Sequence, residues 1–474
     1  MLSRNDLDER QLAAIAFASG GEDTLLVADI GTGKTVIAYT VMLDALRAGR
    51  VKRWLVAAPL MVAEDTWRNE FLKWTHLHNL HVTIACGSAA NRSAIIDKGS
   101  DITVINYENL AWLFKEYPNL RGTADTLPFD GLVCDEIDKL KDISSNRFKQ
   151  IRNRIKHFRM RIGMTGSILP NELTEIWGQA YMVDAGQSFA DDKLSDGTRV
   201  GRSFIKWRRK YFFPVDYKQY DWRPFSDSEK QIIARLSGLA FRLPGQGLPQ
   251  IVRTTPYLLN LPDGIRKLYT ELEREYVTEL ADAAGNVHEI DAINSGTLKG
   301  KLQQICAGFS YIDDNPERDA IWHSYDKYEW LEGLHRSLGL QLLVVYYFNE
   351  ELNELKRRYP GIPYLGAGLS ATKKCGIIQS WNHGFIPLLP IHAQSAGHGL
   401  NLQLSGAHHI AFLTQPWSGG LWSQVVGRLA RLGQAARQVF VHTALYRNTV
   451  DEEVDGVVRE KIRRREYFNS RLEQ

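Results

Sequence analysis

The sequence has 474 residues, of which 44% are hydrophobic and 24% are charged, and its formal net charge is +3. One hydrophobic core seldom grows beyond about 250–300 residues, so this length predicts two or three domains. The composition excludes bulk disorder, and the small net charge excludes a polycation that binds nucleic acid through its overall charge.

Basic residues are nevertheless clustered at 206–210 (KWRRK) and 461–465 (KIRRR). Each cluster could contribute a nucleic-acid surface or could be the solvated face of a helix. The four cysteines are scattered without Cys-x-x-Cys pairs, which argues against a zinc ribbon or a disulfide framework. The polar N-terminus is unlike a signal peptide, and no run approaches the ~18 apolar residues of a membrane span. We therefore expect a soluble, intracellular protein with no membrane partner.

The first predicted element is a short amphipathic helix over residues 7–17, which carries Gln11. A glutamine at this place can face solvent. Upstream of a nucleotide-binding loop, the same side chain can instead read adenine through its amide group, which both donates and accepts hydrogen bonds.

A strand, a glycine loop and a helix follow one another around the stretch VADIGTGKT at 27–35. Gly31 and Gly33 let backbone N–H groups approach a phosphate closely, and the helix N-terminus adds partial positive charge. Lys34 can reach the outer phosphates, and the Thr35 hydroxyl can hold Mg²⁺. The usual pattern is Gly-x-x-x-x-Gly-Lys-Ser/Thr, and an alanine replaces its first glycine here. The stretch predicts a nucleotide-binding site.

The next candidate for the site is a pair of acidic residues. The apolar run 131–134 predicts a buried strand that leads directly into Asp135 and Glu136. An Asp-Glu pair alone is weak evidence, but this one lies about 100 residues after the Gly-Lys-Thr loop. In such an arrangement one carboxylate holds Mg²⁺ and the other polarises the attacking water.

Short apolar runs predict three more strands in the N-terminal region. Because strands alternate with helical stretches, we expect right-handed crossovers and a parallel sheet that binds ligands at its C-terminal strand ends. The phosphate loop and the acid pair both follow such ends. The three strands cover residues 54–58, 102–106 and 161–165.

The alternation of strands and helices stops near residue 185. Residues 186–256 contain an aromatic and basic run, FIKWRRKYFFPVDYKQYDW, and several prolines and glycines. Helices are predicted at 265–280 and 298–306. We interpret this region as a helical insertion and linker. Its tyrosines and tryptophans either pack in a core, which we favour, or stack on bases.

A second α/β unit is predicted from four further apolar runs, and it has no phosphate loop of its own. It offers instead Arg428 and Arg431, three residues apart on one face of a predicted helix. Glycines and apolar residues surround both arginines, which disfavours an ordinary solvated face. The four strands cover residues 341–348, 387–393, 409–413 and 438–443.

Together these stretches resemble the Swi/Snf-like DNA-translocase ATPases of helicase superfamily two, and the resemblance covers nearly the whole chain. ADIGTGKT is similar to motif I of that family, although one residue shorter, WLVAAPLMVAEDTWRNEFLKW is similar to motif Ia and DITVINYENL to motif Ib. LVCDEIDKLKD resembles motif II, with Ile137-Asp138 where the family generally has Ala-His. MTGSILPNELTEIW resembles motif III, SAGHGLNLQ motif V, and residues 424–434 motif VI.

The resemblance implies an α/β fold with two RecA-like parallel-sheet lobes. It implies ATP and Mg²⁺ as cofactors, double-stranded DNA as a partner that is contacted through its phosphate backbone, and a monomer. Because no accessory module is visible, it implies a cytoplasmic protein of a bacterial or phage-infected cell rather than a nuclear remodeller. The implied domains are 1–185 (ATP-binding lobe), 186–325 (helical insertion and linker) and 326–474 (second lobe with a basic C-terminal helix).

The resemblance also implies roles for individual residues. The catalytic residues would be Lys34, Asp135, the base Glu136, and the finger arginines Arg428 and Arg431. The nucleotide would be bound by Gln11, Gly31, Thr32, Gly33, Lys34, Thr35 and Gly399, with Mg²⁺ on Thr35 and Asp135. DNA would be contacted by Pro59, Tyr107, Ser395 and Asn401. Asp138 replaces the histidine that often couples motif II to motif III, so the coupling route differs from that of the family.

The function that these features indicate is an ATP-dependent translocase on double-stranded DNA, with hydrolysis stimulated by DNA. One alternative is a strand-separating helicase or an RNA-dependent ATPase of the same superfamily. Another is a nucleotide-dependent DNA-binding module with vestigial hydrolysis. The retention of all the implied catalytic residues disfavours the second alternative.

Overall fold

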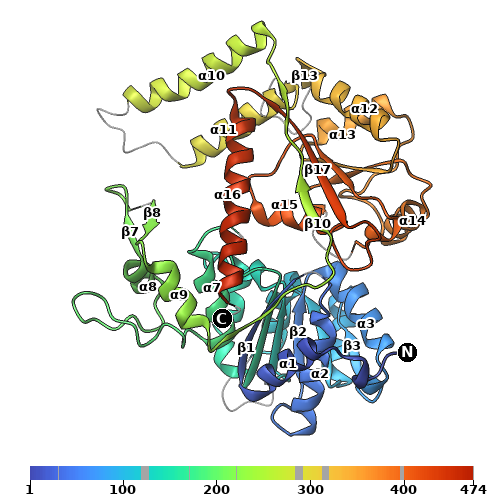
Figure 1. Cartoon of the computed structure of the whole chain (residues 1–474). Coiled ribbons are helices and arrows are strands. Elements are labelled where there is room, and N and C mark those ends of the chain that lie inside the picture. Colours follow the sequence, from blue (N-terminus) through green and yellow to red (C-terminus); the bar gives the residue numbers. More distant parts are fainter. Residues whose placement is uncertain are drawn as a thin grey trace. The chain divides into compact units, whose positions relative to one another are not determined.

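The structure, a computed structural model, describes residues 1–29, 31–118, 127–169, 171–219, 221–282, 292–311, 320–395 and 400–472 (Figure 1). The chain divides into two compact units, unit 1 (Met1–Gln246 and Arg463–Gln474) and unit 2 (Gly247–Ile462). The division falls inside helix α16 (Val450–Arg471), which begins in unit 2 and ends in unit 1. Each unit is built on its own parallel sheet.

The described strands of the unit 1 sheet are β1 (Asp23–Ala28), β2 (Trp54–Ala58), β3 (Val82–Ile84), β4 (Ile102–Asn106), β5 (Gly131–Asp135), β6 (Met160–Thr165) and β9 (Ala240–Leu243). They form a seven-stranded sheet in the order β3-β4-β2-β5-β6-β1-β9, and all their pairings are parallel. The C-terminal strand ends therefore lie at one edge, where β1 leads into the phosphate loop and β5 into the acid pair.

The described helices of unit 1 before α16 are α1 (Glu9–Gly20), α2 (Lys34–Arg47), α3 (Trp67–Lys73), α4 (Ala89–Asp97), α5 (Leu110–Glu116), α6 (Asn146–Arg152), α7 (Glu175–Asp184), α8 (Phe204–Tyr211) and α9 (Ser228–Leu236). Helices α1 to α3 pack on one face of the sheet and α5 to α7 on the other. Along β1, Leu25 and Val27 belong to the hydrophobic core shared with α5 to α7, whereas Leu26 and Ala28 belong to the core shared with α1 to α3. Burial on both faces explains why the strand reads as a continuous apolar run.

The described strands of the unit 2 sheet are β10 (Gln250–Arg253), β11 (Tyr257–Leu259), β14 (Leu342–Tyr346), β15 (Leu388–His392), β16 (His409–Phe412) and β17 (Gln438–Tyr446). Their order is β10-β17-β16-β14-β15, β11 also pairs with β17, and all the pairings are parallel. The described helices before α16 are α10 (Asp263–Asp282), α11 (Ala292–Cys306), α12 (Asp326–Leu338), α13 (Asn349–Arg358), α14 (Ala371–Asn382) and α15 (Gly419–Val426). The two sheets confirm the predicted α/β fold with two parallel-sheet lobes.

The segment 186–325 differs from the helical insertion and linker that the sequence predicts. Its strand β9 completes the sheet of unit 1 beside β1, and its strands β10 and β11 extend the sheet of unit 2. The segment therefore contributes to both units. The chain passes from unit 1 to unit 2 between residues 246 and 247, inside this segment rather than at either of its ends. These strands are three or four residues long, too short to give a recognisable alternation of apolar and polar residues.

The aromatic run within that segment belongs in part to the core of unit 1. Trp207 and Tyr211 on α8 are buried, as the sequence analysis favours. The run continues into an antiparallel hairpin of β7 (Phe212–Pro214) and β8 (Trp222–Pro224). Tyr217, between the two strands, is 92% exposed, and Phe213 on β7 is 40% exposed. This hairpin therefore presents aromatic side chains to solvent.

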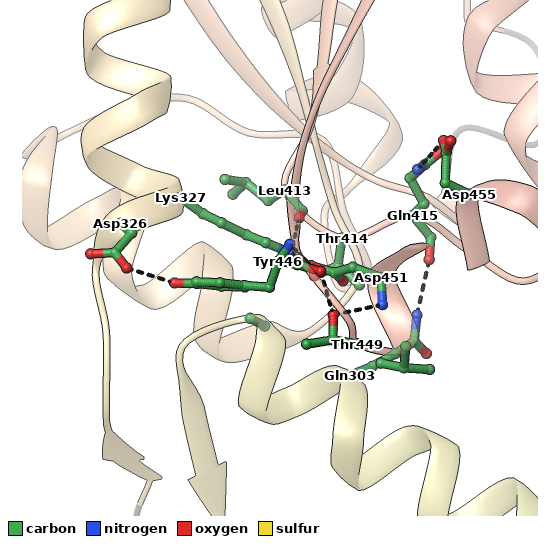
Figure 2. Close-up of polar contacts among 12 residues, drawn as sticks. Gln303, Asp326, Lys327, Leu413, Thr414, Gln415, Tyr446, Thr449, Asp451 and Asp455 are labelled. Atoms are coloured by element: carbon green, nitrogen blue, oxygen red, sulfur yellow. Dashed lines mark hydrogen bonds and ion pairs between the residues drawn. The ribbon is translucent and has the colours of Figure 1, made fainter. Parts of the chain in front are cut away.

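Buried polar side chains fix the chain that follows β16 in unit 2 (Figure 2). Lys327 on α12 donates a hydrogen bond of 3.1 Å to the Leu413 carbonyl and forms a 2.8 Å ion pair with Asp451 on α16. The side chain of Gln415 donates to the Asp455 carboxylate at 2.9 Å. Helices α12 and α16 thereby hold the connection from β16 to α15.

Replacement of Lys327 by Met should lower the free energy of unfolding by about 3–5 kcal/mol, because it leaves the buried Asp451 carboxylate without its counter-ion. The two side chains of this pair are only 3% and 5% exposed. Lys299 and Glu453 form a matched control, a 2.6 Å pair that also reaches α16 but whose side chains are 44% and 48% exposed. Lys299→Met should cost at most about 1 kcal/mol. Urea unfolding measures both, and equal losses would contradict this prediction.

Candidate active site

The phosphate loop connects β1 to α2, as the sequence predicts. Gly31 and Gly33 have φ angles of 85° and 86°, a left-handed conformation that glycine adopts without strain. A Cβ atom added at Gly33 would displace the side-chain amide of Gln11 from its present place against the loop. Lys34 is the first residue of α2, and its ammonium donates to the Ala28 carbonyl at 3.2 Å. Thr35 follows in the first helical turn, where backbone N–H groups are free of intrahelical partners.

Gln11 lies directly against this loop. Its Nε2 donates to the Thr32 carbonyl at 3.0 Å, and its Oε1 accepts from the backbone N–H of Asp8 at 3.0 Å. The second contact is part of a capping box at the start of α1, which fixes the side chain toward the loop. The structure therefore places Gln11 beside the loop residue Thr32, and its contact with adenine stays a prediction.

Asp135 is the last residue of β5, and two aromatic residues hold it in place. Nε1 of Trp67 donates to Oδ2 of Asp135 at 2.9 Å, and the Tyr107 hydroxyl donates to its backbone carbonyl at 2.8 Å. Burial and the neighbouring Glu136 raise the pKa of Asp135, whereas Lys34 lowers it. The Lys34 ammonium is thus within electrostatic reach of the acid pair. Trp67 is not among the residues predicted for the site, and its only signal in the sequence is its place in the stretch that resembles motif Ia.

Glu136 adopts a left-handed backbone conformation with φ 52° and ψ 58°. Such a conformation costs free energy in a residue that has a Cβ atom, and residues of this kind are enriched at functional sites. The chain turns sharply after β5 as a result, and the short 3₁₀ helix Ile137–Leu140 follows. The sharp turn fixes the backbone on which the predicted catalytic base is carried.

Asp138 occupies the place where the resembled family generally has histidine. Its Oδ1 atom is buried and has no hydrogen-bond partner among the described residues. Burial and the nearby Glu136 raise the pKa of Asp138. This shift favours the protonated carboxyl, which can donate a hydrogen bond as well as accept one, as a histidine can.

The donor set at the loop and the acid pair fits Mg²⁺. This ion prefers oxygen ligands and is usually bound by one or two carboxylates together with substrate phosphates and water. The Asp135 carboxylate and the Thr35 hydroxyl are donors of that kind. Asp135 ends β5 and Thr35 lies in the first turn of α2, both at the C-terminal edge of the unit 1 sheet.

The two arginines in unit 2 do not lie on a helix, contrary to the sequence prediction. Helix α15 ends at Val426, and Arg428 and Arg431 lie in the turns that follow. Gly427 is the C-cap of α15, and Leu429 and Ala430 beyond it pack into the core of unit 2. Arg428 is 6% exposed, and Nη1 of Arg431 donates to the Leu400 carbonyl at 3.2 Å.

The predicted DNA-contacting residues differ in their exposure. Pro59 and Tyr107 are buried, and the Tyr107 hydroxyl already contacts Asp135. Asn401 is exposed and Ser395 is half-buried. DNA contacts by these four residues stay a prediction. Gly399, predicted to bind the nucleotide, lies outside the described residues.

Within the described part of the chain, no helix has the length and the apolar character needed to cross a membrane.

Comparisons with known proteins identify a family for the part of the chain that carries this site. The model of the SNF2-related domain matches residues 14–184, which contain the phosphate loop and the acid pair. Putative protein p41 of Acyrthosiphon pisum secondary endosymbiont phage 1 is 31% identical over 444 residues, which are 90% of this chain and 90% of that protein.

Two more distant relatives also match along most of the chain. The uncharacterized ATP-dependent helicase YqhH of Bacillus subtilis is 22% identical, over 92% of this chain and 74% of that protein. The DNA repair and recombination protein RAD54B of Gallus gallus is 20% identical, over 92% of this chain and 50% of that protein. From the matched domain, the extent of the phage relative and the site geometry, we conclude that the chain belongs to the SNF2-related family of DNA-dependent ATPases.

Proposed function

We propose that the chain is a translocase on double-stranded DNA, driven by ATP hydrolysis that the duplex stimulates. One observation carries the proposal most strongly. Unit 1 holds a phosphate loop and an acid pair, of which Asp135 is buried, at one edge of its sheet, and unit 2 repeats the parallel-sheet architecture with two arginines instead. The combination of a nucleotide-binding sheet with a second parallel sheet that carries arginines supports this proposal.

The chain's own residues have distinct roles in this proposal. Lys34 exchanges its hydrogen bond to the Ala28 carbonyl for an oxygen of the outer phosphate. Glu136 accepts the proton of the attacking water, and the turn after β5 holds its backbone in place. Asp135, oriented by Trp67, and Thr35 would hold Mg²⁺, which when bound neutralises charge on the phosphate oxygens. Arg428 and Arg431 stabilise the charge on the transferring phosphoryl group.

The β7–β8 hairpin supports one alternative, a helicase that separates strands. Strand separation needs an aromatic or apolar wedge to offset base stacking of about 1.4 kcal/mol per step. Tyr217, which is 92% exposed between β7 and β8, is a candidate wedge in the described part of the chain. Arg209, Lys210 and Arg223 lie on the same hairpin and its preceding helix, however, and are suited to backbone phosphates.

A pair of substrates distinguishes the two functions. A translocase should displace the third strand of a DNA triplex when ATP is supplied, and should leave a forked duplex intact under the same conditions. Glu136→Gln is the negative control for both assays. Efficient fork unwinding without triplex displacement, lost on Tyr217→Ala, would replace the proposal by the helicase alternative. Nucleotide-dependent DNA binding with no displacement in either assay would favour the binding-module alternative.

A further inference from the structure

Asp29, the first loop residue after β1, forms hydrogen bonds within unit 1 through its backbone N–H, its carbonyl and its carboxylate. Its backbone N–H donates to the Leu243 carbonyl at 3.1 Å, and its own carbonyl accepts from the Thr32 hydroxyl at 2.8 Å. Its carboxylate accepts from the backbone N–H of Gly245 at 2.8 Å. Nη2 of Arg242 donates to both carboxylate oxygens at 2.8 Å. One aspartate thus joins the phosphate loop to the segment that contains β9.

Arg242 is placed for this contact by the sheet itself. In the parallel pairing of β1 with β9, Arg242 lies opposite Val27, so it stands beside the end of the strand that feeds the loop. Its side chain is 7% exposed, and its Nη1 also donates to the carbonyls of Val27 at 3.3 Å and Leu243 at 3.2 Å. The guanidinium therefore bridges the backbone of both strands and the Asp29 carboxylate.

Two other arginines of unit 1 interact with the region around Asp29 and the end of β9. Arg10 on α1 donates to the Pro244 carbonyl at 2.9 Å, which fixes the chain just after β9. Burial lowers the pKa of Arg465 near the end of α16, while Glu466 and Asp29 raise it and Arg242 lowers it. Arg465 is thus a second cation within electrostatic reach of Asp29.

An aspartate in a phosphate loop is costly unless its charge is compensated, because a carboxylate repels the phosphates of the nucleotide. The Arg242 guanidinium, which bonds both carboxylate oxygens of Asp29, offsets this repulsion. It also restrains a loop whose glycines Gly31 and Gly33 would otherwise leave it many conformations.

We propose that Arg242 is a positioning residue for ATP binding, which neutralises Asp29 and holds it at the start of the phosphate loop. The inference rests on the assignment of this loop to ATP. It names a residue that acts through Asp29 and that lies 213 positions from it in the sequence.

Unit 1 offers a matched control pair at the opposite end of the same strand. Arg161 on β6 donates to the two carboxylate oxygens of Asp23 at 2.7 Å each, and the two side chains are 12% and 20% exposed. The pair links β1 to a neighbouring strand, as the Asp29–Arg242 pair does. Loss of either pair should therefore lower stability, but only one pair lies at the phosphate loop.

The test compares Arg242→Gln with Arg161→Gln in ATPase assays at saturating DNA, together with thermal unfolding. We expect Arg242→Gln to raise the KM for ATP by about tenfold or more with a smaller change in kcat, since charge compensation acts on the bound phosphates. Arg161→Gln should lower the unfolding temperature with an unchanged KM. The double variant Asp29→Asn with Arg242→Gln should recover most of the KM, because neither charge remains.

The outcomes separate this inference from the assignment on which it rests. If Arg242→Gln fails to fold, the double variant and Arg242→Lys, which keeps the positive charge, carry the same comparison. Equal KM values in Arg242→Gln and Arg161→Gln, or no recovery in the double variant, would overturn the positioning role. If instead Lys34→Ala binds ATP as well as the wild-type protein does, the loop is not the ATP site and the assignment itself fails.

Discussion

Glu136→Gln is expected to abolish ATP turnover while leaving ATP binding intact. The glutamine keeps the shape of the side chain but cannot accept the proton of the attacking water, and loss of a general base costs roughly 10²–10⁴-fold in rate. The variant should therefore hold ATP longer and stay longer on DNA. Lys34→Ala should also abolish turnover, but with loss of binding, because it removes positive charge from the phosphate site.

Asp142→Asn is a suitable control for these two variants. Asp142 is an exposed acid in the same turn region after β5, and its carboxylate accepts hydrogen bonds from Ser144, which an asparagine can also do. Turnover should stay at the wild-type level. Single-turnover hydrolysis and equilibrium nucleotide binding measure the two properties separately. Normal hydrolysis by Glu136→Gln would show that this residue is not the base.

Arg428→Ala and Arg431→Ala should each lower the maximal rate of ATP hydrolysis by roughly 10³-fold or more, the range known for finger arginines. The affinity for ATP should fall much less, because the charge that these residues stabilise develops only in the transition state. Lysine at either position keeps the charge but loses the planar fork of the guanidinium, so it should restore only part of the rate.

The measurement for the arginines is kcat and KM for ATP at saturating DNA, with thermal unfolding as a check on folding. Arg428 is only 6% exposed, so its alanine variant also leaves space in the interior of unit 2. Arg437→Ala is the control, since this exposed arginine lies a few residues further along the chain. A loss of affinity with an unchanged maximal rate would show that Arg428 and Arg431 are structural.

The central strands were predictable because they are buried on both faces and bounded by turn residues. Strands β2 and β4 lie within the predicted ranges, and β5 and β6 differ from them by one residue. The short strand β3 and the edge strand β9 were missed. Three or four residues with mixed exposure carry too little periodicity to stand out from a loop.

The candidate site shows the same contrast, here between residues that are contiguous in sequence and residues that are far apart in it. The phosphate loop and the acid pair are contiguous in sequence, so their residue types and spacing reveal them. Trp67 and Arg242 reach Asp135 and Asp29 from 68 and 213 positions away. Helix α3 carries Trp67 and the pairing of β9 with β1 carries Arg242, so both contacts depend on the folded sheet. The turns that carry Arg428 were read as helix, because the spacing of apolar residues in that stretch fits a helix as well.

Because helix α16 contributes to the core of unit 1, its place in the sequence determines when unit 1 can finish folding during synthesis. Phe468 is fully buried in the same core as Tyr211 and Trp207, yet the ribosome makes it after the whole of unit 2. Domains usually fold as they emerge, N-terminal unit first. Here the nascent N-terminal unit must wait with part of its core uncovered until residues 463–472 are made. The newborn chain is therefore expected to acquire its nucleotide-binding lobe last, which leaves an interval in which a chaperone could bind that uncovered core.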